Sequence, residues 1–281
     1  MEEKRVKKKE LCISVFLILT LLLCFTTASR EKTYTDKVYA TRKILCDKKY
    51  IIHAGGYIEG ACGTIYSYTN SKDALINSCK NGNSVVEIDF MLSKDGKVIC
   101  AHDGVETWAV GINVIEPITL AEFKEKKVFD EFETMALDDL AKVMYEYEGL
   151  YIVTDVKDDN VRICKLIKDF YPDLQDRFII QIYHKEEYTP IYDLGFHNII
   201  YTLYKSNSEE LRTDVLKDFA EKHELVAFTF WESYLEYTYF WEAMKETKVP
   251  IFVHTVNDEN RIRDCLNLGA NGVYTDLVTH K

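Results

Sequence analysis

The stretch "VVEIDFMLSKDGKVICAHD", residues 85–103, contains two apolar, strand-like runs on either side of the dipeptide Asp95-Gly96. An Asp-Gly pair flanked by such runs is a strong signal for a β-hairpin with a two-residue turn, and it leaves no room for a helix between the runs. The segment therefore predicts a hairpin. Its two ends carry the polar residues Glu87, Asp89, His102 and Asp103.

The register of this hairpin decides which polar side chains meet. With a two-residue turn, Lys94 faces Lys97, and counting outward places Asp89 directly opposite His102. Because alternate residues of a strand share a face, Glu87 then points the same way as both. A bulged three-residue turn would shift this pairing by one residue.

Eight short apolar runs recur along the chain, and segments with helical spacing separate most of them. Alternating strands and helices imply parallel pairing, because each crossover helix returns the chain to the start of the sheet. The pattern predicts an α/β (β/α)₈ TIM barrel over residues 49–281, with the hairpin added after the second strand. The runs are 50–54, 84–92, 150–156, 177–183, 198–204, 225–230, 250–256 and 271–276.

An open, doubly wound sheet is the structural alternative. The first run is followed by "HAGGYIEGACG", residues 53–63, which does not fit the dinucleotide-binding pattern G-x-G-x-x-G. The sequence contains no phosphate-loop motif either. The barrel is therefore the favoured fold.

The N-terminus has the pattern of a targeting segment. The basic "MEEKRVKKKE" precedes an uncharged apolar run at residues 11–25, and small residues follow near Ala28. Because a membrane-spanning helix needs about 20 apolar residues, we expect residues 1–28 to be a cleaved signal peptide, with a signal anchor as the alternative. Residues 29–48 are polar and without strong periodicity, so we expect a spacer there. We therefore expect an exported protein that is extracellular or held at the cell envelope.

The net charge and the cysteine content limit the classes of binding partner and metal site. The formal charge of −11 becomes −13 without residues 1–28, which carry five Lys or Arg and three Asp or Glu. A body this acidic does not favour nucleic acid as a partner. Its six cysteines show no zinc-ligand spacing. Four are expected as small core residues, and a Cys46–Cys62 disulfide beside the first strand is the one pairing we consider.

Function in such a barrel is located where the strands end. Two carboxylates at positions i and i+2, with a third from a neighbouring strand, form an oxygen-ligand cluster suited to Mg²⁺ or Ca²⁺. Taken singly, each residue also has a structural interpretation, as a core histidine, a solvated face, an ion pair or a packing aromatic. Their combination favours a site. The residues at the strand ends are His53, Glu87, Asp89, Asp155, Lys157, Tyr183, Trp231, His254 and Asp276.

Four stretches together resemble the glycerophosphodiester phosphodiesterase family, which belongs with the phosphatidylinositol-specific phospholipase C-like barrels. The resemblance covers about residues 50–276, and residues 87–103 are its most specific part. The stretches are "IIHAGG" (51–56), "YTNSKDALINSCKNG" (68–82), the hairpin segment (85–103) and "YIVTDVKDD" (151–159).

The resemblance implies a metal-dependent hydrolase that cleaves a small, in some cases lipid-derived phosphodiester, foremost a glycerophosphodiester, to an alcohol and a phosphomonoester. Lys157 would neutralise charge on the phosphoryl oxygens, and imidazole suits proton transfer near neutral pH. The resemblance implies Glu87, Asp89 and Asp155 as metal ligands and His53 and His102 as the acid–base pair. From their place at the strand ends, we expect Lys157, Tyr183, Trp231 and His254 to contact the substrate or its phosphate, and from its adjacency we expect Asp103 to orient His102.

The sequence departs from the family pattern at four positions. Ala54 stands where the family usually has arginine, Thr69 where it has glutamate, and His254 where it has tryptophan. Asp155 is one methylene shorter than the usual glutamate, and the Asp155-x-Lys157 pattern is closer to sphingomyelinase D-type phospholipases. These departures leave the metal site intact and leave the choice of substrate open.

Three other functions remain as alternatives. A phospholipase D-like enzyme acting on intact or lyso phospholipid headgroups would need an apolar surface at the barrel mouth, for which residues 105–118 are the candidate. A Schiff-base lysine at Lys157 is disfavoured, because three nearby carboxylates would keep the amine protonated. A catalytically inactive envelope binding module would not need the full set of polar residues that the sequence retains.

Overall fold

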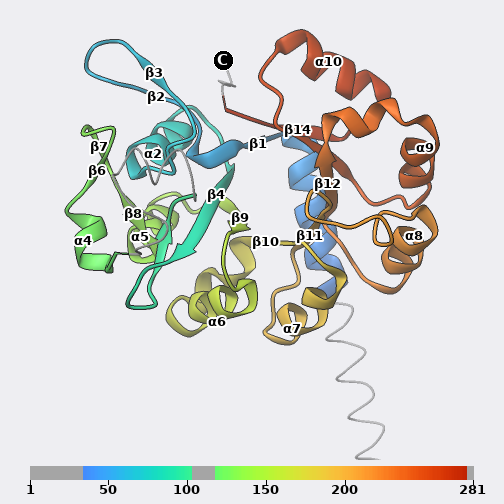
Figure 1. The fold of residues 1–281 in the computed structure, drawn as a ribbon, viewed down its shortest axis with the longest axis horizontal. Helices are drawn as coiled ribbons and strands as arrows, with labels where there is room; N and C mark the ends of the chain where they lie inside the picture. The colour runs from blue at the N-terminus through green and yellow to red at the C-terminus, as the bar shows by residue number, and fades with distance from the viewer. Residues whose placement is uncertain (1–33, 103–117, 277–281) are drawn as a thin grey trace, which may run out of the picture.

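Eight parallel strands close into a barrel in the computed structural model, which describes residues 34–102 and 118–276 (Figure 1). The first strand pairs with both the second and the last strand of the ring, which completes the closure. The predicted barrel is confirmed, and the open sheet is excluded. In ring order the strands are β1 (Tyr50–Ile52), β4 (Val85–Leu92), β9 (Tyr151–Val156), β10 (Phe178–Ile182), β11 (Ile199–Thr202), β12 (Ala227–Trp231), β13 (Ile251–His254) and β14 (Gly272–Thr275).

Helices cover the outside of the barrel (Figure 1). In α6, Asp159 caps the first turn by accepting a hydrogen bond from the Arg162 amide at 3.0 Å, and Ile163 and Ile167 bury one face against the strands. The helices are α2 (Lys72–Lys80), α4 (Leu120–Lys124), α5 (Leu137–Glu146), α6 (Asn160–Phe170), α7 (Tyr188–Asp193), α8 (Thr213–Lys222), α9 (Thr238–Glu246) and α10 (Glu259–Leu268).

The barrel interior is built in layers of side chains. At the amino ends of the strands lies an apolar layer. It consists of Ile51, Val85, Val153, Ile179, Ile200, Ala227, Phe252 and Tyr274. The residue two positions after each of these points to the same face of its strand, and in every case it is polar. We call these eight residues the polar layer: His53, Glu87, Asp155, Gln181, Thr202, Thr229, His254 and Asp276.

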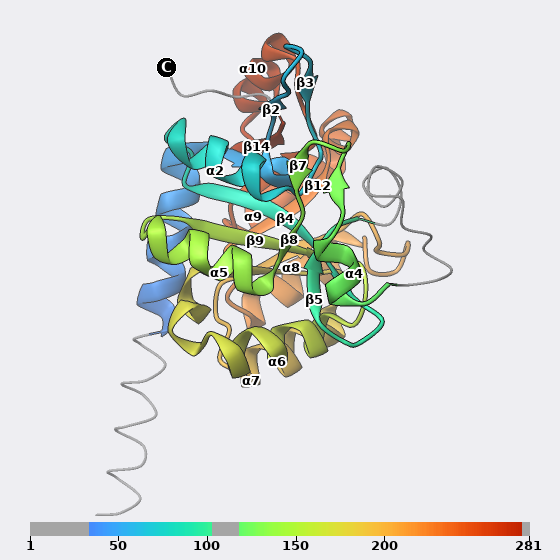
Figure 2. The same cartoon turned by 90° about the vertical axis from the view of Figure 1, so that its left-hand side faces the viewer.

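A helix over residues 34–48 lies across the amino-terminal end of the barrel (Figure 2). Val38 and Leu45 pack against the apolar layer, and Arg42 donates a hydrogen bond to the Leu225 carbonyl at 2.6 Å. The prediction of a polar spacer is therefore wrong for these residues. Two buried apolar side chains seven residues apart are enough to hold the helix on one side, and such a sparse repeat gives little periodicity in the sequence.

The predicted hairpin exists, and β4 pairs antiparallel with β5 (Val98–Cys100). Its turn has three residues rather than two, because the Ser93 amide donates to the Lys97 carbonyl at 2.8 Å. Gly96 adopts a φ of 72°, which glycine tolerates best, so the bulged alternative is the one observed.

The longer turn shifts every pair by one residue. Phe90 stands opposite Cys100, and the Ala101 amide donates to the Asp89 carbonyl at 3.1 Å. The predicted pairing of Asp89 with His102 is therefore wrong.

Short elements connect the main ones. β2 (Ile58–Glu59) pairs with β3 (Ile65–Tyr66), β6 (Lys127–Val128) pairs with β7 (Phe132–Glu133), and β8 (Met135–Ala136) pairs with β5. Short 3₁₀ helices occur at η1 (His53–Gly55), η2 (Pro172–Arg177), η3 (Lys185–Glu187) and η4 (Glu232–Glu236).

Two predictions about the chain's chemistry are settled by the described residues. Cys46 and Cys62 are both free thiols, so the disulfide considered between them is not formed. Cys100, Cys164 and Cys265 are buried in the core, as expected, and Cys79 is half-buried.

In the two described ranges no helix is long and apolar enough to cross a membrane, and residues 1–28 lie outside those ranges.

Candidate active site

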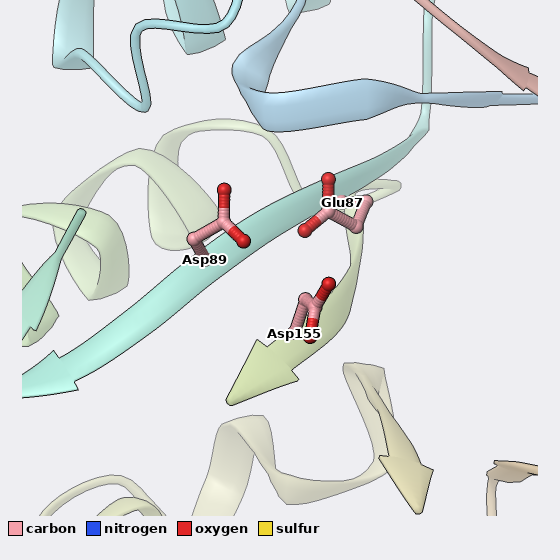
Figure 3. A group of neighbouring side chains, drawn as sticks. All are labelled: Glu87, Asp89 and Asp155. Carbon is pink, nitrogen blue, oxygen red and sulfur yellow. The ribbon is translucent and has the colours of Figure 1, made fainter. Parts of the chain in front are cut away.

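Three carboxylates meet inside the barrel where β4 and β9 run side by side (Figure 3). Asp89 is aligned with Asp155 in the sheet register, and Glu87 precedes Asp89 on the same face. One oxygen from each carboxylate lies within 4.8 Å of the others. Glu87 and Asp89 are each 1% exposed, so their negative charges are costly unless cations compensate them. The structure thus brings together the three predicted metal ligands.

Glu87 is the least satisfied member of this group. Its Oε2 accepts a hydrogen bond from the Ala54 amide at 2.7 Å, whereas Oε1 is buried without a hydrogen-bond partner. Burial and the charge of Asp89 raise the pKa of Glu87 well above its usual value. A buried oxygen of this kind calls for a ligand, and Mg²⁺ and Ca²⁺ prefer carboxylate oxygens. The donor set therefore fits a hard divalent cation.

The turn after β1 delivers the amide that holds Glu87. Ala54 has a φ of 46° and Gly56 a φ of 87°, so the chain bends back sharply over the barrel mouth. A Cβ on Gly56 would lie 2.4 Å from Ser78 Oγ, which leaves room only for glycine. The "HAGG" motif is therefore a structural requirement for positioning Glu87.

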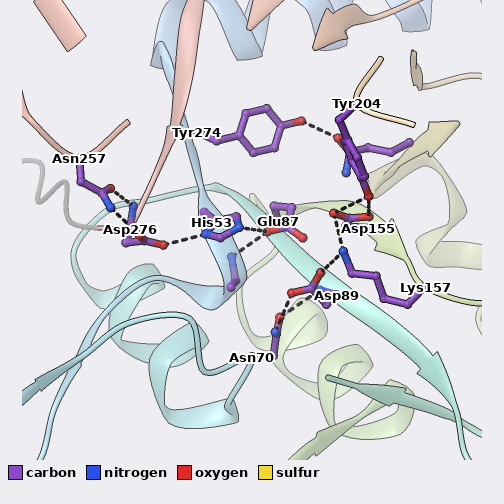
Figure 4. A network of polar contacts seen from close by, with 12 residues as sticks. His53, Asn70, Glu87, Asp89, Asp155, Lys157, Tyr204, Asn257, Tyr274 and Asp276 are labelled. Carbon is purple, nitrogen blue, oxygen red and sulfur yellow. Dashed lines mark hydrogen bonds and ion pairs between the residues drawn. The ribbon is translucent and has the colours of Figure 1, made fainter. Parts of the chain in front are cut away.

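Lys157 lies between two of the three carboxylates (Figure 4). Its Nζ is 2.9 Å from Asp89 Oδ1 and 2.9 Å from Asp155 Oδ2. Although burial opposes it, the charges of Asp89 and Asp155 raise the pKa of Lys157. The amine is held in its charged form, which is the wrong form for a Schiff base. Asn70 completes the arrangement by donating to Asp89 Oδ2 at 2.8 Å.

Two tyrosines hold the third carboxylate. The Tyr183 and Tyr204 hydroxyls both donate to Asp155 Oδ1, the second at 3.0 Å. Against the effect of burial, the Lys157 charge and the Tyr183 hydrogen bond lower the pKa of Asp155. Tyr183, expected to contact substrate, is 3% exposed and has its hydroxyl turned to Asp155. This geometry fits a positioning residue better than a substrate contact.

His53 is held by a chain of two further residues (Figure 4). Its Nδ1 lies 2.7 Å from Asp276 Oδ1, and its Nε2 lies 3.9 Å from Glu87 Oε2. Asn257 fixes Asp276 by donating to Oδ2 at 2.6 Å and accepting from the Asp276 amide at 2.8 Å. Burial would lower the pKa of His53, but the Asp276 hydrogen bond and the Glu87 charge outweigh it and raise this pKa to about 9.

His102 and His53 border the same aromatic ring. The Tyr68 ring stacks on His53 with 4.8 Å between centroids, and it lies 5.5 Å from the ring of His102. His102 is thus near the site by way of Tyr68 rather than by strand pairing with Asp89. Asp103, expected to orient His102, lies outside the described residues.

The remaining predicted contacts form an aromatic wall. The His254 ring lies 4.9 Å from the ring of Trp231 and 5.7 Å from that of Tyr204. Trp231 is 49% exposed at the end of β12 and is open to a ligand. His254 faces inward, and its Nε2 is buried without a hydrogen-bond partner.

Sequence reasoning missed the residues that hold the predicted ones. Asn70, Tyr204 and Asn257 were given no role, and Asp276 was noticed only as a strand-end residue. Asp276 could have been assigned, because it occupies the polar position that follows an apolar strand on the same face. Asn70 and Asn257 give no comparable signal, since their partners are distant in sequence.

Comparisons with known proteins agree with this geometry. The model of the glycerophosphoryl diester phosphodiesterase family matches residues 60–280. A search of curated proteins finds no match. Similar solved structures include two glycerophosphodiester phosphodiesterases. The one from Thermotoga maritima is 21% identical, with a TM-score of 0.57, and the match covers 81% of this chain and 94% of that one. The one from Parabacteroides distasonis is 16% identical, with a TM-score of 0.64, and the match covers 81% of this chain and 93% of that one. An Oleispira antarctica phosphodiesterase in complex with the product sn-glycerol-3-phosphate is also similar. It is 18% identical, with a TM-score of 0.61, and the match covers 81% of this chain and 92% of that one. At these identities the structures show a shared fold.

Proposed function

Because the chain belongs to the glycerophosphoryl diester phosphodiesterase family, and is therefore a phosphoric diester hydrolase, we propose that it cleaves glycerophosphodiesters with a divalent cation held by Glu87, Asp89 and Asp155. The observation that carries this proposal is the buried carboxylate group with an unpartnered Glu87 Oε1 beside the His53–Asp276 pair. The relative from Oleispira antarctica, whose structure contains sn-glycerol-3-phosphate, supports the same phosphomonoester product here.

The chain's own residues prepare this site for an anionic substrate. The Ala54 amide and the Asn70 side chain fix the carboxylates of Glu87 and Asp89. Lys157 contributes a permanent positive charge, which reduces the repulsion between the acidic site and a phosphodiester. A divalent cation, when bound, stabilises the negative charge on the phosphoryl oxygens as a Lewis acid.

His53 and His102 are the proposed acid–base pair. One imidazole removes the proton from the attacking oxygen, and the other donates a proton to the leaving alcohol. Asp276 and Asn257 keep the His53 ring in one orientation, and Tyr68 packs against both imidazoles. Water and a neighbouring substrate hydroxyl are both candidates for the attacking group.

The test is a screen of the full chain in mild detergent against glycerophosphocholine, glycerophosphoethanolamine and lysolipids, with added Mg²⁺ or Ca²⁺ and mass-spectrometric detection of products. We expect release of glycerol phosphate that EDTA abolishes. His102→Ala should abolish turnover and leave cation binding largely intact, whereas Glu87→Gln should lose both. Absence of any EDTA-sensitive release would contradict the proposal, and measurable activity of His102→Ala would remove that residue's role.

The same screen separates this function from the phospholipase D-like alternative, because the two substrates give different phosphomonoesters. A glycerophosphodiester releases glycerol phosphate, whereas a lysolipid that loses its headgroup leaves a phosphomonoester that still carries an acyl chain. The apolar surface considered for that alternative, residues 105–118, lies almost wholly outside the described residues. No described observation therefore favours it.

We also propose that the protein is exported, on the basis of the apolar run at residues 11–25. The helix over residues 34–48 covers the amino-terminal end of the barrel (Figure 2), and Asp155 lies near the carboxyl end of β9. Fractionation of cells that express the full chain, with N-terminal sequencing of the product, tests export and cleavage together.

A further inference from the structure

A small cavity opens within the polar layer beside the carboxylates. Its volume is about 40 Å³, and residues from several barrel strands line it, among them Glu87, Asp155, Thr202 and His254. A cavity needs a volume of about 10–15 Å³ to hold one water molecule. The cavity therefore has room for a few water-sized atoms, such as a hydroxymethyl group, and is too small for a phosphate or a quaternary ammonium group.

Three polar atoms of the lining residues are buried without a hydrogen-bond partner. They are Glu87 Oε1, Thr202 Oγ1 and His254 Nε2. Thr202 and Glu87 are each 1% exposed, so neither group gains its hydrogen bonds from bulk solvent. Glu87 Oε1 is assigned to the cation in the proposed function. Thr202 and His254 then remain as a second pair of groups that require a polar partner.

The chemistry of the lining selects a neutral partner. The carboxylates of Glu87 and Asp155 disfavour a second anion. Burial lowers the pKa of His254 to about 4, so its ring is neutral and pairs with an uncharged group. Thr202 offers a hydroxyl that both donates and accepts. A substrate hydroxyl can form hydrogen bonds with groups of this kind, whereas a methyl group of similar size cannot.

We propose that Thr202 and His254 form a hydroxyl-binding subsite that holds the hydroxymethyl group of the glycerol moiety and selects hydroxylated substrates. The inference rests on the proposed function and deepens it. The cavity borders Glu87 and Asp155, which are proposed to hold the cation, so a group that enters it belongs to the part of the substrate next to the phosphate.

The test compares two ligands by calorimetry on the full chain with Mg²⁺ or Ca²⁺. They are sn-glycerol 3-phosphate and its analogue in which a methyl group replaces the hydroxymethyl group. We expect the wild type to bind the analogue at least about tenfold more weakly, because the analogue leaves buried polar groups of the cavity unpaired. His254→Phe should reduce this ratio to below threefold, Thr202→Val should reduce it in part, and His254→Gln should retain more of it than His254→Phe.

Thr229→Val is the matched control, because Thr229 is buried in the same layer but is not among the residues that line the cavity. It should leave the ratio of affinities unchanged, and thermal unfolding should show that every variant is folded. The inference is overturned if the wild type does not discriminate between the ligands, if His254→Phe keeps the wild-type ratio, or if Thr229→Val shifts it equally. Binding requires no turnover, so this result is separate from the test of hydrolysis. Hydrolysis without discrimination would remove the subsite and leave the proposed function intact.

Discussion

The pair formed by His53 and Asp276 gives the sharpest prediction, through the substitution Asp276→Asn. The side chain keeps its size and its contact with Asn257, but its charge is lost and an amide group can face His53 Nδ1. The imidazole then loses the acceptor that fixes its tautomer and orientation.

The magnitude follows from the 2.7 Å contact. A hydrogen bond to a charged group contributes about 1.5–3 kcal/mol, which corresponds to a loss of about 10- to 150-fold in rate. In Ser-His-Asp enzymes the equivalent change costs about 10⁴, because the wrong tautomer is populated. We therefore expect kcat to fall by about 10² to 10⁴ with a smaller change in KM, since the group acts on a proton and not on substrate binding. Steady-state hydrolysis of a glycerophosphodiester measures both constants.

Two variants frame this result. Asn257→Ala should cause a smaller loss, because it removes the support of Asp276 and leaves its charge. Asp218→Asn, on an exposed helix surface where Asp218 pairs with Lys222, should have no effect. A kcat for Asp276→Asn within threefold of the wild type would refute the role of Asp276.

In metal-free protein, the His53–Asp276 pair should make the free energy of unfolding depend on pH. The pKa of His53 is raised to about 9 from an ordinary value of 6.5. The resulting stabilisation is fully present below pH 6.5 and is lost as the pH rises through about 9, and it amounts to at most about 3 kcal/mol. Urea unfolding in EDTA at pH 6 and pH 9.5 should therefore differ less for Asp276→Asn than for the wild type.

Three further predictions concern the supports of the site. Glu87→Gln should raise the melting temperature in EDTA, because it removes a buried acid whose ionisation is opposed by burial and by Asp89. It should also abolish the increase that Mg²⁺ or Ca²⁺ gives the wild type, and a cation-dependent shift that persists would contradict the ligand assignment. Tyr204→Phe should weaken cation binding by about 10- to 100-fold in calorimetry, because Asp155 loses a hydrogen bond while the ring remains. Leu45→Ala should cost about 2–5 kcal/mol in urea unfolding, whereas exposed Tyr39→Ala should stay within about 0.5 kcal/mol; equal effects would mean that the helix over residues 34–48 is not part of the core.

The eight barrel strands could be predicted because each has an apolar run of suitable length between polar segments. The position of the polar layer was readable for the same reason: Ile51 is followed two residues later by His53, and Val153 by Asp155. Local sequence therefore determines which residues enter the barrel. It does not determine which of them meet, because Asp276 and His53 are 223 residues apart.

The hairpin register shows where local reasoning fails. An Asp-Gly pair suits a two-residue turn and also a three-residue turn with glycine in the left-handed region. The choice is made by contacts that the sequence does not display: Asp95 Oδ1 accepts from the Leu120 amide at 2.8 Å, and the Lys94 amide donates to the Ile118 carbonyl at 2.8 Å. Packing of a later segment against the turn therefore decides the register, and with it the position of His102.

The polar layer divides into groups that the protein satisfies and groups that it does not. His53 is paired with Asp276, and Gln181 accepts from the Tyr274 hydroxyl at 3.1 Å, so these side chains are fixed before any ligand arrives. Four other atoms of the layer are buried with their hydrogen-bonding capacity unused: Glu87 Oε1, Thr202 Oγ1, Thr229 Oγ1 and His254 Nε2. Each unused group costs stability in the free protein, and a ligand that satisfies it recovers that cost on binding. Three of these four atoms, those of Glu87, Thr202 and His254, belong to residues that line the cavity beside the carboxylates, so ligand contacts are expected there; Thr229 does not line it.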